Sequence, residues 1–269
     1  MDLCLVRISA YWDQIYQDGY TELDWMLDAA HVARQSILLT VGMKAIRWPE
    51  FYIPQDVEVR PHRNGRIGLD STLAPKVLAF ISETVARYRD RPEIVAWQVE
   101  NEPFNRSGPQ QWWIEPRMIR REVQTVRNLD SRPIVVNAFA HFDSQVDAQS
   151  RPRRVEPERE VVDVADILGL DVYTTIGART AASDWAESAG RWLRKAEERG
   201  RRAWIIESQG EPWDSPSFTP RDMVAIHERL EKARFSTILL WGCEHWFSRA
   251  AAGDASWLEA AKRRVLGFS

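Results

Sequence analysis

Short apolar runs alternate along this chain with longer segments whose apolar residues recur every three or four positions. The short runs are rich in Val, Ile, Leu and Trp, and end at polar or turn-forming residues, which predicts buried strands. The longer segments have the periodicity of amphipathic helices. The predicted strands are 3–9, 36–41, 94–102, 133–137, 167–173, 203–209 and 237–241. The predicted helices are 21–34, 73–88, 112–129, 184–199, 220–234 and 256–265.

Because predicted strands alternate with predicted helices, the pattern favours βα units around a parallel sheet. A single α/β barrel has about 250 residues, so the 269 residues are consistent with one catalytic barrel domain over 1–269. A doubly wound sheet has the same alternation, but no Gly-rich phosphate loop follows the first strand. In a barrel the chemistry lies at the carboxyl ends of strands. Those ends carry Arg7, Asn101, Glu102, Tyr173, Glu207 and Trp241.

Composition narrows the class of protein. Apolar residues make up 44%, charged residues 28%, and the net charge is −3, which is ordinary for a globular protein and predicts neither a nucleic-acid nor a membrane surface. The mixed-sign run 151–160 is predicted to be a solvated loop. The start lacks the features of a signal peptide, which favours a cytoplasmic location. Cys4 and Cys243 are predicted to be buried free thiols.

Two predicted strands end in a glutamate. Asn101-Glu102-Pro103 closes one of them, and Glu207 lies at the end of another. A glutamate beside a buried strand is costly unless it is paired or used. For an isolated Asn-Glu-Pro, a capping or salt-bridging role is the simpler interpretation. Two such strand ends together indicate an acid/base or nucleophile pair.

With these two motifs the chain resembles clan A of the retaining glycoside hydrolases, the cellulase, mannanase and β-galactosidase type of TIM barrel. In that clan Asn-Glu-Pro follows the fourth barrel strand, and a second glutamate ends the seventh. The resemblance extends from Leu5 to about Trp246. No single motif is very specific, but five of them occur in the expected order.

The resemblance also implies that the first strand and helix of the usual eight units are absent, because only two predicted strands precede Asn-Glu-Pro. The first visible strand, with Arg7, then corresponds to the clan's second. A start placed inside a longer gene and a natural seven-unit barrel are both open. The strands at 3–9 and 237–241 would flank a gap, and we expect a homo-oligomer contact to cover part of it.

The resemblance implies a role for each strand-end residue. Glu102 would be the acid/base, with its pKa held up by burial and by the charge of the nucleophile Glu207. Glu100, two residues earlier, is a rival for the acid role, but the Asn-Glu-Pro pattern favours Glu102. Arg7 would lie beside Glu207 and keep it ionised, and Asn101 would donate to the sugar 2-hydroxyl. Tyr173 would hydrogen-bond the nucleophile, and Trp241 would form the floor of the sugar site.

The chain contains 13 tryptophans, and sugar clefts use indole rings against the apolar face of a pyranose. Further sugar contacts are predicted for loop residues, each with packing as the alternative. They are Trp48, Trp112, Trp113, Trp213, Trp246, His141 and His245. Glu211 and Glu244 also lie near strand ends, but the sequence indicates no partner for either.

The sequence therefore predicts a retaining β-glycosidase that acts on an oligosaccharide or β-glycoside without metal or organic cofactor. The alternative is a weakly active or inactive relative that binds carbohydrate, because a barrel short of one unit holds its two glutamates less firmly. A metal-dependent isomerase would need clustered His, Asp and Glu ligands at strand ends, which the sequence lacks.

Overall fold

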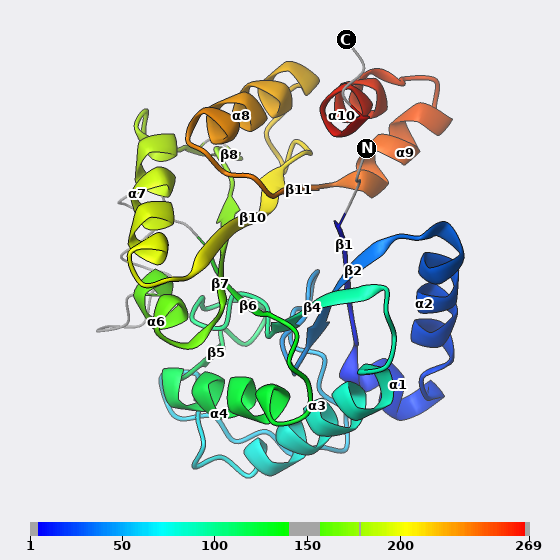
Figure 1. The fold of residues 1–269 in the computed structure, drawn as a ribbon, viewed down its shortest axis with the longest axis vertical. Helices are drawn as coiled ribbons and strands as arrows, with labels where there is room; N and C mark the ends of the chain where they lie inside the picture. Colours follow the sequence, from blue (N-terminus) through cyan, green and yellow to red (C-terminus); the bar gives the residue numbers. More distant parts are fainter. Residues whose placement is uncertain (1–4, 140–156, 178, 267–269) are drawn as a thin grey trace. The chain divides into compact units, whose positions relative to one another are not determined.

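The computed structural model describes residues 5–139, 157–177 and 179–266. Strands and helices alternate as the hydrophobic pattern predicts (Figure 1). Seven strands form one parallel sheet in the order β1-β2-β4-β6-β7-β10-β11. They are β1 (Leu5–Ser9), β2 (Ser36–Val41), β4 (Ile94–Val99), β6 (Ile134–Phe139), β7 (Ile167–Val172), β10 (Arg202–Gln209) and β11 (Ile238–Trp241). No eighth strand joins this sheet within the described ranges, so the prediction of seven βα units is confirmed.

The chain divides into two compact units, an amino unit of Leu5–Ala138 and Ser150–Leu168, and a carboxy unit formed mainly by Gly169–Ser269. In the amino unit, Leu39 of β2 is in register with both Ile8 and Trp97, which lie on the two flanking strands. Leu39 and Trp97 are fully buried, so the centre of this part of the sheet is core.

The helices of the amino unit cover this part of the sheet. They are α1 (Trp12–Asp18), α2 (Thr21–Ala33), α3 (Ala74–Tyr88), α4 (Pro116–Arg127) and α6 (Pro157–Val164). Along α3, Val77, Ile81 and Val85 recur every fourth residue and are buried, which is the helical stripe that the sequence predicts. Helix α3 packs against α4, and α4 packs against α6.

Two predictions in the amino unit are wrong at their boundaries. The helix predicted from Trp112 begins only at Pro116, because Trp113–Ile114 forms the short strand β5 and pairs with β3 (Arg66–Ile67). The end of the predicted loop 151–160 is helical, since α6 starts at Pro157 and buries Val161 against the unit. Periodicity missed β5 because that strand has only two residues, and it missed the start of α6 because that segment is short and carries charged residues.

In the carboxy unit β10 pairs with β11, and Gln209 is in register with Trp241. The helices are α7 (Trp185–Glu197), α8 (Pro220–Lys232), α9 (Cys243–Ala251) and α10 (Ser256–Leu266), and a small hairpin joins β8 (Thr175–Ile176) to β9 (Arg179–Thr180). The predicted start of α8 is confirmed: the backbone N–H of Thr219 donates to the carboxylate of Asp222 at 2.8 Å.

Other packing predictions are corrected. Cys243 is exposed at the start of α9 and is not a buried thiol, because a helix rather than a loop follows β11. Trp25 on α2 is 69% exposed and does not lie in the core. Cys4 and His141 lie outside the described residues. The expected homo-oligomer stays a prediction.

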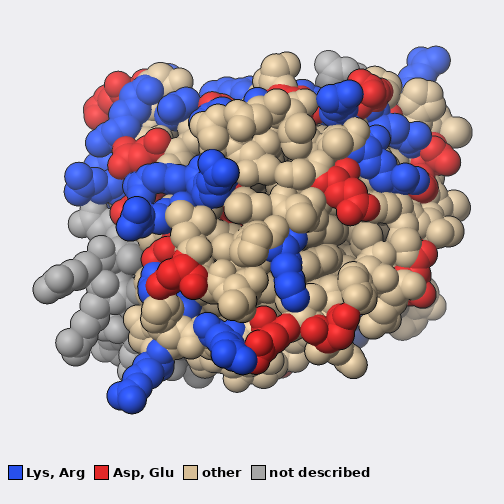
Figure 2. Space-filling view, turned by 90° about the horizontal axis from the view of Figure 1, so that it is seen from below, with Lys and Arg blue, Asp and Glu red and all other residues tan. Residues whose placement is uncertain are grey.

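The face in Figure 2 carries Lys and Arg side chains interspersed with Asp and Glu. Ion pairs between helices include Arg120 with Glu160 at 2.7 Å and Arg87 with Asp24 at 2.6 Å. Among the described helices, none has the length and apolar content needed to cross a bilayer.

Candidate active site

Glu102 lies three residues past the end of β4 and is 8% exposed. Its backbone has a positive φ of 43°, and Glu100 has one of 58°, a region that non-glycine residues rarely adopt. Tertiary hydrogen bonds hold this turn. The backbone N–H of Glu102 donates to Asn137 Oδ1 at 2.8 Å, and its carbonyl accepts from Lys44 Nζ at 2.7 Å. The side chain of Asn105 donates to Glu102 Oε2 at 3.3 Å.

Asn101 lies at the centre of an amide network. Its Oδ1 accepts from Arg7 at 2.6 Å and from Asn137 Nδ2 at 3.0 Å. The Oδ1 of Asn137 accepts from Gln98 at 3.0 Å as well as from the backbone of Glu102. Asn101 is 5% exposed, whereas Asn137 and Gln98 are fully buried. Because the oxygen of Asn101 is occupied twice, its NH2 group is the part left to donate to a ligand.

Arg7 lies on β1, and its Nη2 is the donor that reaches Asn101. The guanidinium therefore orients the amide beside Glu102. The predicted ion pair between Arg7 and Glu207 stays a prediction.

Lys44 is fully buried in the loop after β2 and supports the β4 turn. Its ammonium also pairs with Glu50 at 3.1 Å. A buried ammonium requires such partners, since desolvation of an unpaired charge costs on the order of several kcal/mol. The backbone N–H groups of Met43 and Lys44 donate to the two carboxyl oxygens of Glu100 at 3.0 and 2.5 Å. Glu100 thus ties the β2 loop to the β4 turn, which assigns it a structural role.

Glu100 and Glu122 of α4 form a fully buried carboxyl pair. Burial raises the pKa of Glu100 to about 7, against the lowering effect of its two backbone hydrogen bonds. Burial, the charge of Glu100 and a hydrogen bond to it raise the pKa of Glu122 well above its ordinary value. Since Glu100 has backbone donors, we assign the shared proton to Glu122.

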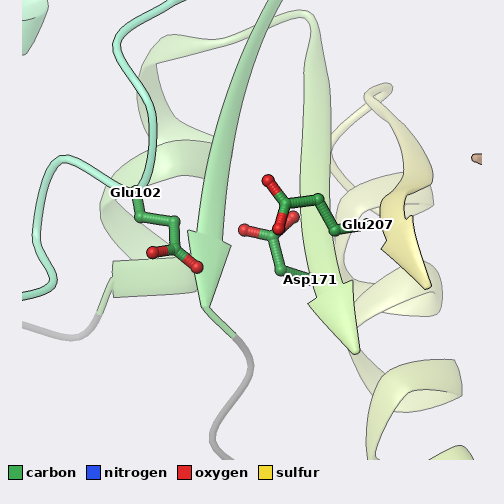
Figure 3. Close-up of side chains that lie close together, drawn as sticks. All are labelled: Glu102, Asp171 and Glu207. Carbon is green, nitrogen blue, oxygen red and sulfur yellow. The ribbon is translucent and has the colours of Figure 1, made fainter. Parts of the chain in front are cut away.

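In the carboxy unit, Glu207 lies within β10 and is 5% exposed. The hydroxyl of Tyr173, just past β7, donates to Glu207 Oε2 at 2.6 Å, so the predicted contact between them is present. Asp171 lies two residues before Tyr173 and shares its face of β7. Figure 3 shows the side chains of Asp171 and Glu207 turned toward each other, with carboxyl oxygens within 4.8 Å.

Aromatic side chains surround Glu207 in this unit. The ring of Trp213 lies 5.1 Å from that of Tyr173, centre to centre. The indole N–H groups of Trp213 and Trp241 donate to the same oxygen, Oε1 of Glu211, at 2.9 and 3.1 Å. Trp213 is 42% exposed and Trp241 is half-buried. Both indoles therefore have surface left for a ligand.

The remaining predicted sugar contacts separate into two groups. Trp48 is 69% exposed in the loop after β2 and stays a candidate. His245 packs edge-on against Trp257 at 4.9 Å, and Trp246 is buried and donates to the carbonyl of Gly210 at 2.6 Å. Trp112 and Trp113 also pack, the first against Phe51 and the second with its N–H on the carbonyl of Asn64. Packing, the alternative given for each, describes these residues best.

The sequence pattern did not identify three residues of this arrangement, nor the contacts that Glu211 makes. Asn137 and Asp171 are polar residues in or near the ends of apolar strands, the same signal that identifies Glu102, and a stricter use of that signal would include them. Lys44 and the partners of Glu211 carry no such signal. Their roles depend on loops after different strands, and local spacing does not predict those contacts.

No protein-family model matches this sequence. No curated protein matches it either. Among solved structures, the GH5_18 protein of Streptomyces cattleya in complex with GlcNAc superposes with a TM-score of 0.61 at 13% identity, over 87% of this chain and 60% of that one. A structure of fungal β-1,4-galactanases gives a TM-score of 0.60 at 13% identity, over 93% and 80% of the two chains. The endo-β-1,4-mannanase of Thermotoga petrophila gives 0.57 at 13% identity, over 88% and 61%.

The chain thus spans about 60% of the length of the first of these proteins. At such identities the likeness concerns the fold. The predicted α/β fold of the TIM-barrel type is confirmed by its likeness to these solved structures.

Proposed function

We propose that this protein is a retaining glycoside hydrolase that cleaves β-glycosidic bonds, with Glu102 as acid/base and Glu207 as nucleophile. The observation that carries the proposal is the hydrogen bond from Tyr173 to the buried Glu207 at the end of a parallel strand, in a chain with this fold. Glu102 supports it, because it follows another strand of the same sheet beside the ordered Asn101. Carboxyl ends of barrel strands share one face, where barrel enzymes carry their chemistry.

The proposed reaction has two displacements. Glu207 attacks the anomeric carbon while Glu102 gives a proton to the leaving oxygen. Water then attacks the glycosyl-enzyme as Glu102 takes a proton back, so the product keeps its configuration. This chemistry requires carboxyl groups roughly 5–5.5 Å apart. Asn101 would donate from its NH2 group to the sugar 2-hydroxyl, a bond that strengthens in the transition state.

The substrate class to assay first follows from the structural neighbours. They include a protein in complex with GlcNAc, β-1,4-galactanases and an endo-β-1,4-mannanase. We propose a β-linked hexose oligosaccharide for this chain, bound against Trp213, Trp241 and Trp48. A β-1,4-linked panel of galactan, mannan and their oligosaccharides, with nitrophenyl β-hexosides beside it, covers this class.

The test combines two variants with product stereochemistry. Glu102→Gln and Glu207→Gln should each lower kcat by about 10²–10⁴-fold or more, with the fold retained by circular dichroism. Glu197→Gln, an exposed carboxyl on α7, is the matched control and should keep full activity. Proton NMR of the first product should show the retained β-anomer.

Azide separates the two roles. With Glu207→Gly it should restore turnover and yield a glycosyl azide of inverted configuration, whereas with Glu102→Gly the azide product should keep the β configuration. Both Gln variants turning over at the control's rate would contradict the proposal. Sugar binding without turnover in the unaltered protein would instead support the alternative, a carbohydrate-binding relative.

A further inference from the structure

Glu211 is built into the loop after β10, between two indole rings. Its Oε1 accepts the N–H of Trp213 at 2.9 Å and that of Trp241 at 3.1 Å. An indole N–H only donates, so both rings depend on an acceptor in this position. Within the described part of the chain, the second oxygen, Oε2, has no hydrogen-bond donor, and Glu211 is only half-buried.

The backbone around Glu211 holds this carboxylate in place. Gln209 is fully buried, and its Nε2 donates to the carbonyls of Glu211 at 3.2 Å and Thr175 at 2.6 Å. Its Oε1 accepts from the backbone N–H of Thr175 at 3.0 Å. The loop after β10 is therefore tied to the loop after β7 by one side chain.

Two glycines allow the loop after β10 to approach the end of β11 closely. A Cβ on Gly210 would lie 2.2 Å from the carbonyl oxygen of Trp241. Gly242 has a φ of 108°, and a Cβ there would lie 2.9 Å from the Cβ of Glu211. Trp213 itself has a positive φ of 45°, which tertiary contacts must sustain. This geometry indicates a formed binding element rather than a loose surface acid.

The same element connects to the proposed nucleophile. The ring of Trp213 lies against that of Tyr173 at 5.1 Å, and the hydroxyl of Tyr173 donates to Glu207. Glu211 is thus two side chains away from Glu207 within one unit. A ligand on the exposed face of Trp213 would meet a carboxylate oxygen beside an apolar ring.

We propose that Glu211 is a specificity-determining residue that binds a hexopyranose hydroxyl through Oε2 while Oε1 orients the indoles of Trp213 and Trp241. This inference rests on the proposed function, since it concerns the sugar that the glycosidase would bind. The chemistry is that of sugar recognition: a carboxylate accepts from a hydroxyl, and an indole face covers the apolar C–H surface of the ring. The two interactions together select both the hydroxyl's position and the ring's orientation.

The test measures binding separately from turnover. Titrations of manno-, galacto- and cello-tetraose are followed by tryptophan fluorescence and calorimetry in a Glu207→Gln background. Glu211→Ala should raise Kd for the best ligand by about 10–100-fold, and Glu211→Gln, which keeps an acceptor for the indoles, by less. In the otherwise unaltered enzyme, Glu211→Ala should raise KM by a similar factor with kcat within about threefold. Glu244→Ala, an exposed acid after the next strand, is the matched control.

A second variant separates direct contact from orientation of the indole. Trp213→Phe keeps a ring without the N–H, so Glu211→Ala added to it should still weaken binding by a further tenfold or more if Oε2 meets the sugar. Binding by the double variant equal to that of Trp213→Phe alone would overturn the inference. An unchanged Kd in Glu211→Ala, or no tetraose bound at millimolar concentration, would overturn it as well. Glu211-dependent binding without any hydrolysis would refute the proposed glycosidase and leave the inference standing.

Discussion

The two units each supply one of the proposed glutamates, but they hold them by different means. Around Glu102 the side chains are buried and polar: Asn137 donates to Asn101 and accepts from the backbone of Glu102, and Lys44 donates to the carbonyl of Glu102 in a strained turn. In the carboxy unit, Glu207 accepts a hydrogen bond from the hydroxyl of Tyr173. The partly exposed indoles of Trp213 and Trp241 in the same unit donate to Glu211. Buried polar networks rigidify only when every member is satisfied, whereas exposed aromatic rings leave surface for a ligand.

The side chains of the two units therefore have different roles. The amino unit fixes the position of one carboxyl group with hydrogen bonds that no substrate replaces. The carboxy unit presents partly exposed side chains that would contact the proposed substrate. Substitutions in the first are therefore expected to change stability, and substitutions in the second to change binding or rate.

The largest expected effect is a loss of unfolding free energy in Lys44→Met, which would remove a hydrogen bond from the turn that carries Glu102. It removes the donor to the Glu102 carbonyl and leaves Glu50 without its ion pair. Loss of one partner of a buried pair costs about 3–5 kcal/mol, and because Glu50 is partly exposed we expect about 3 kcal/mol of unfolding free energy. Urea denaturation measures this. Trp213→Ala, on the exposed loop of the other unit, should lose less than about 1 kcal/mol, and equal losses would remove the distinction between the units.

The next effect concerns pH and the pair of Glu100 and Glu122. Both folded pKa values are raised, so between pH 5 and 8 the native state binds more protons than the unfolded chain. The contribution of these two groups to the free energy of unfolding should therefore be largest below about pH 4.5, and it should be lost as pH rises through about 7. For Glu100 alone the fall is on the order of 3 kcal/mol, from about 1.4 kcal/mol for each pH unit between its ordinary pKa of 4.5 and about 7.

Glu122→Gln tests this, because it keeps a donor for Glu100 and removes the titration of Glu122. Its unfolding free energy should exceed that of the unaltered protein at pH 8 by about 2 kcal/mol and match it near pH 5. Glu197→Gln, with an exposed carboxyl, should follow the unaltered protein at both pH values. A Glu122→Gln curve parallel to that of the unaltered protein would mean that the pair does not share a proton.

The smallest effect is expected from Tyr173→Phe, which removes only the hydroxyl on Glu207. The ring and its contact with Trp213 remain, so the unfolding free energy should change by less than about 1 kcal/mol. We expect kcat to fall about tenfold, equivalent to about 1.4 kcal/mol in the barrier. A loss confined to KM would place Tyr173 in substrate binding rather than beside the nucleophile.

Much of this molecule follows from local pattern. The alternation of apolar strands and amphipathic helices is a property of neighbouring residues, so it predicts β4, β7 and β10 to within a few positions. Strand-end chemistry is local too, because a polar residue after an apolar run is visible in the sequence. For that reason the sequence by itself identifies Asn101, Glu102, Tyr173 and Glu207 as candidates.

Which of these residues touch one another depends on the tertiary structure. Arg7 contacts Asn101, a partner that the sequence does not indicate, since register across β1, β2 and β4 sets its neighbours. Glu211 had no predicted partner, yet it accepts from two indoles because Gly210 and Gly242 let distant loops approach. Glu100 and Glu122 acquire their shared proton only when a helix buries both carboxyl groups together. Local pattern determines where a side chain is placed along a strand; burial and contact depend on segments far apart in the chain, which local spacing does not encode.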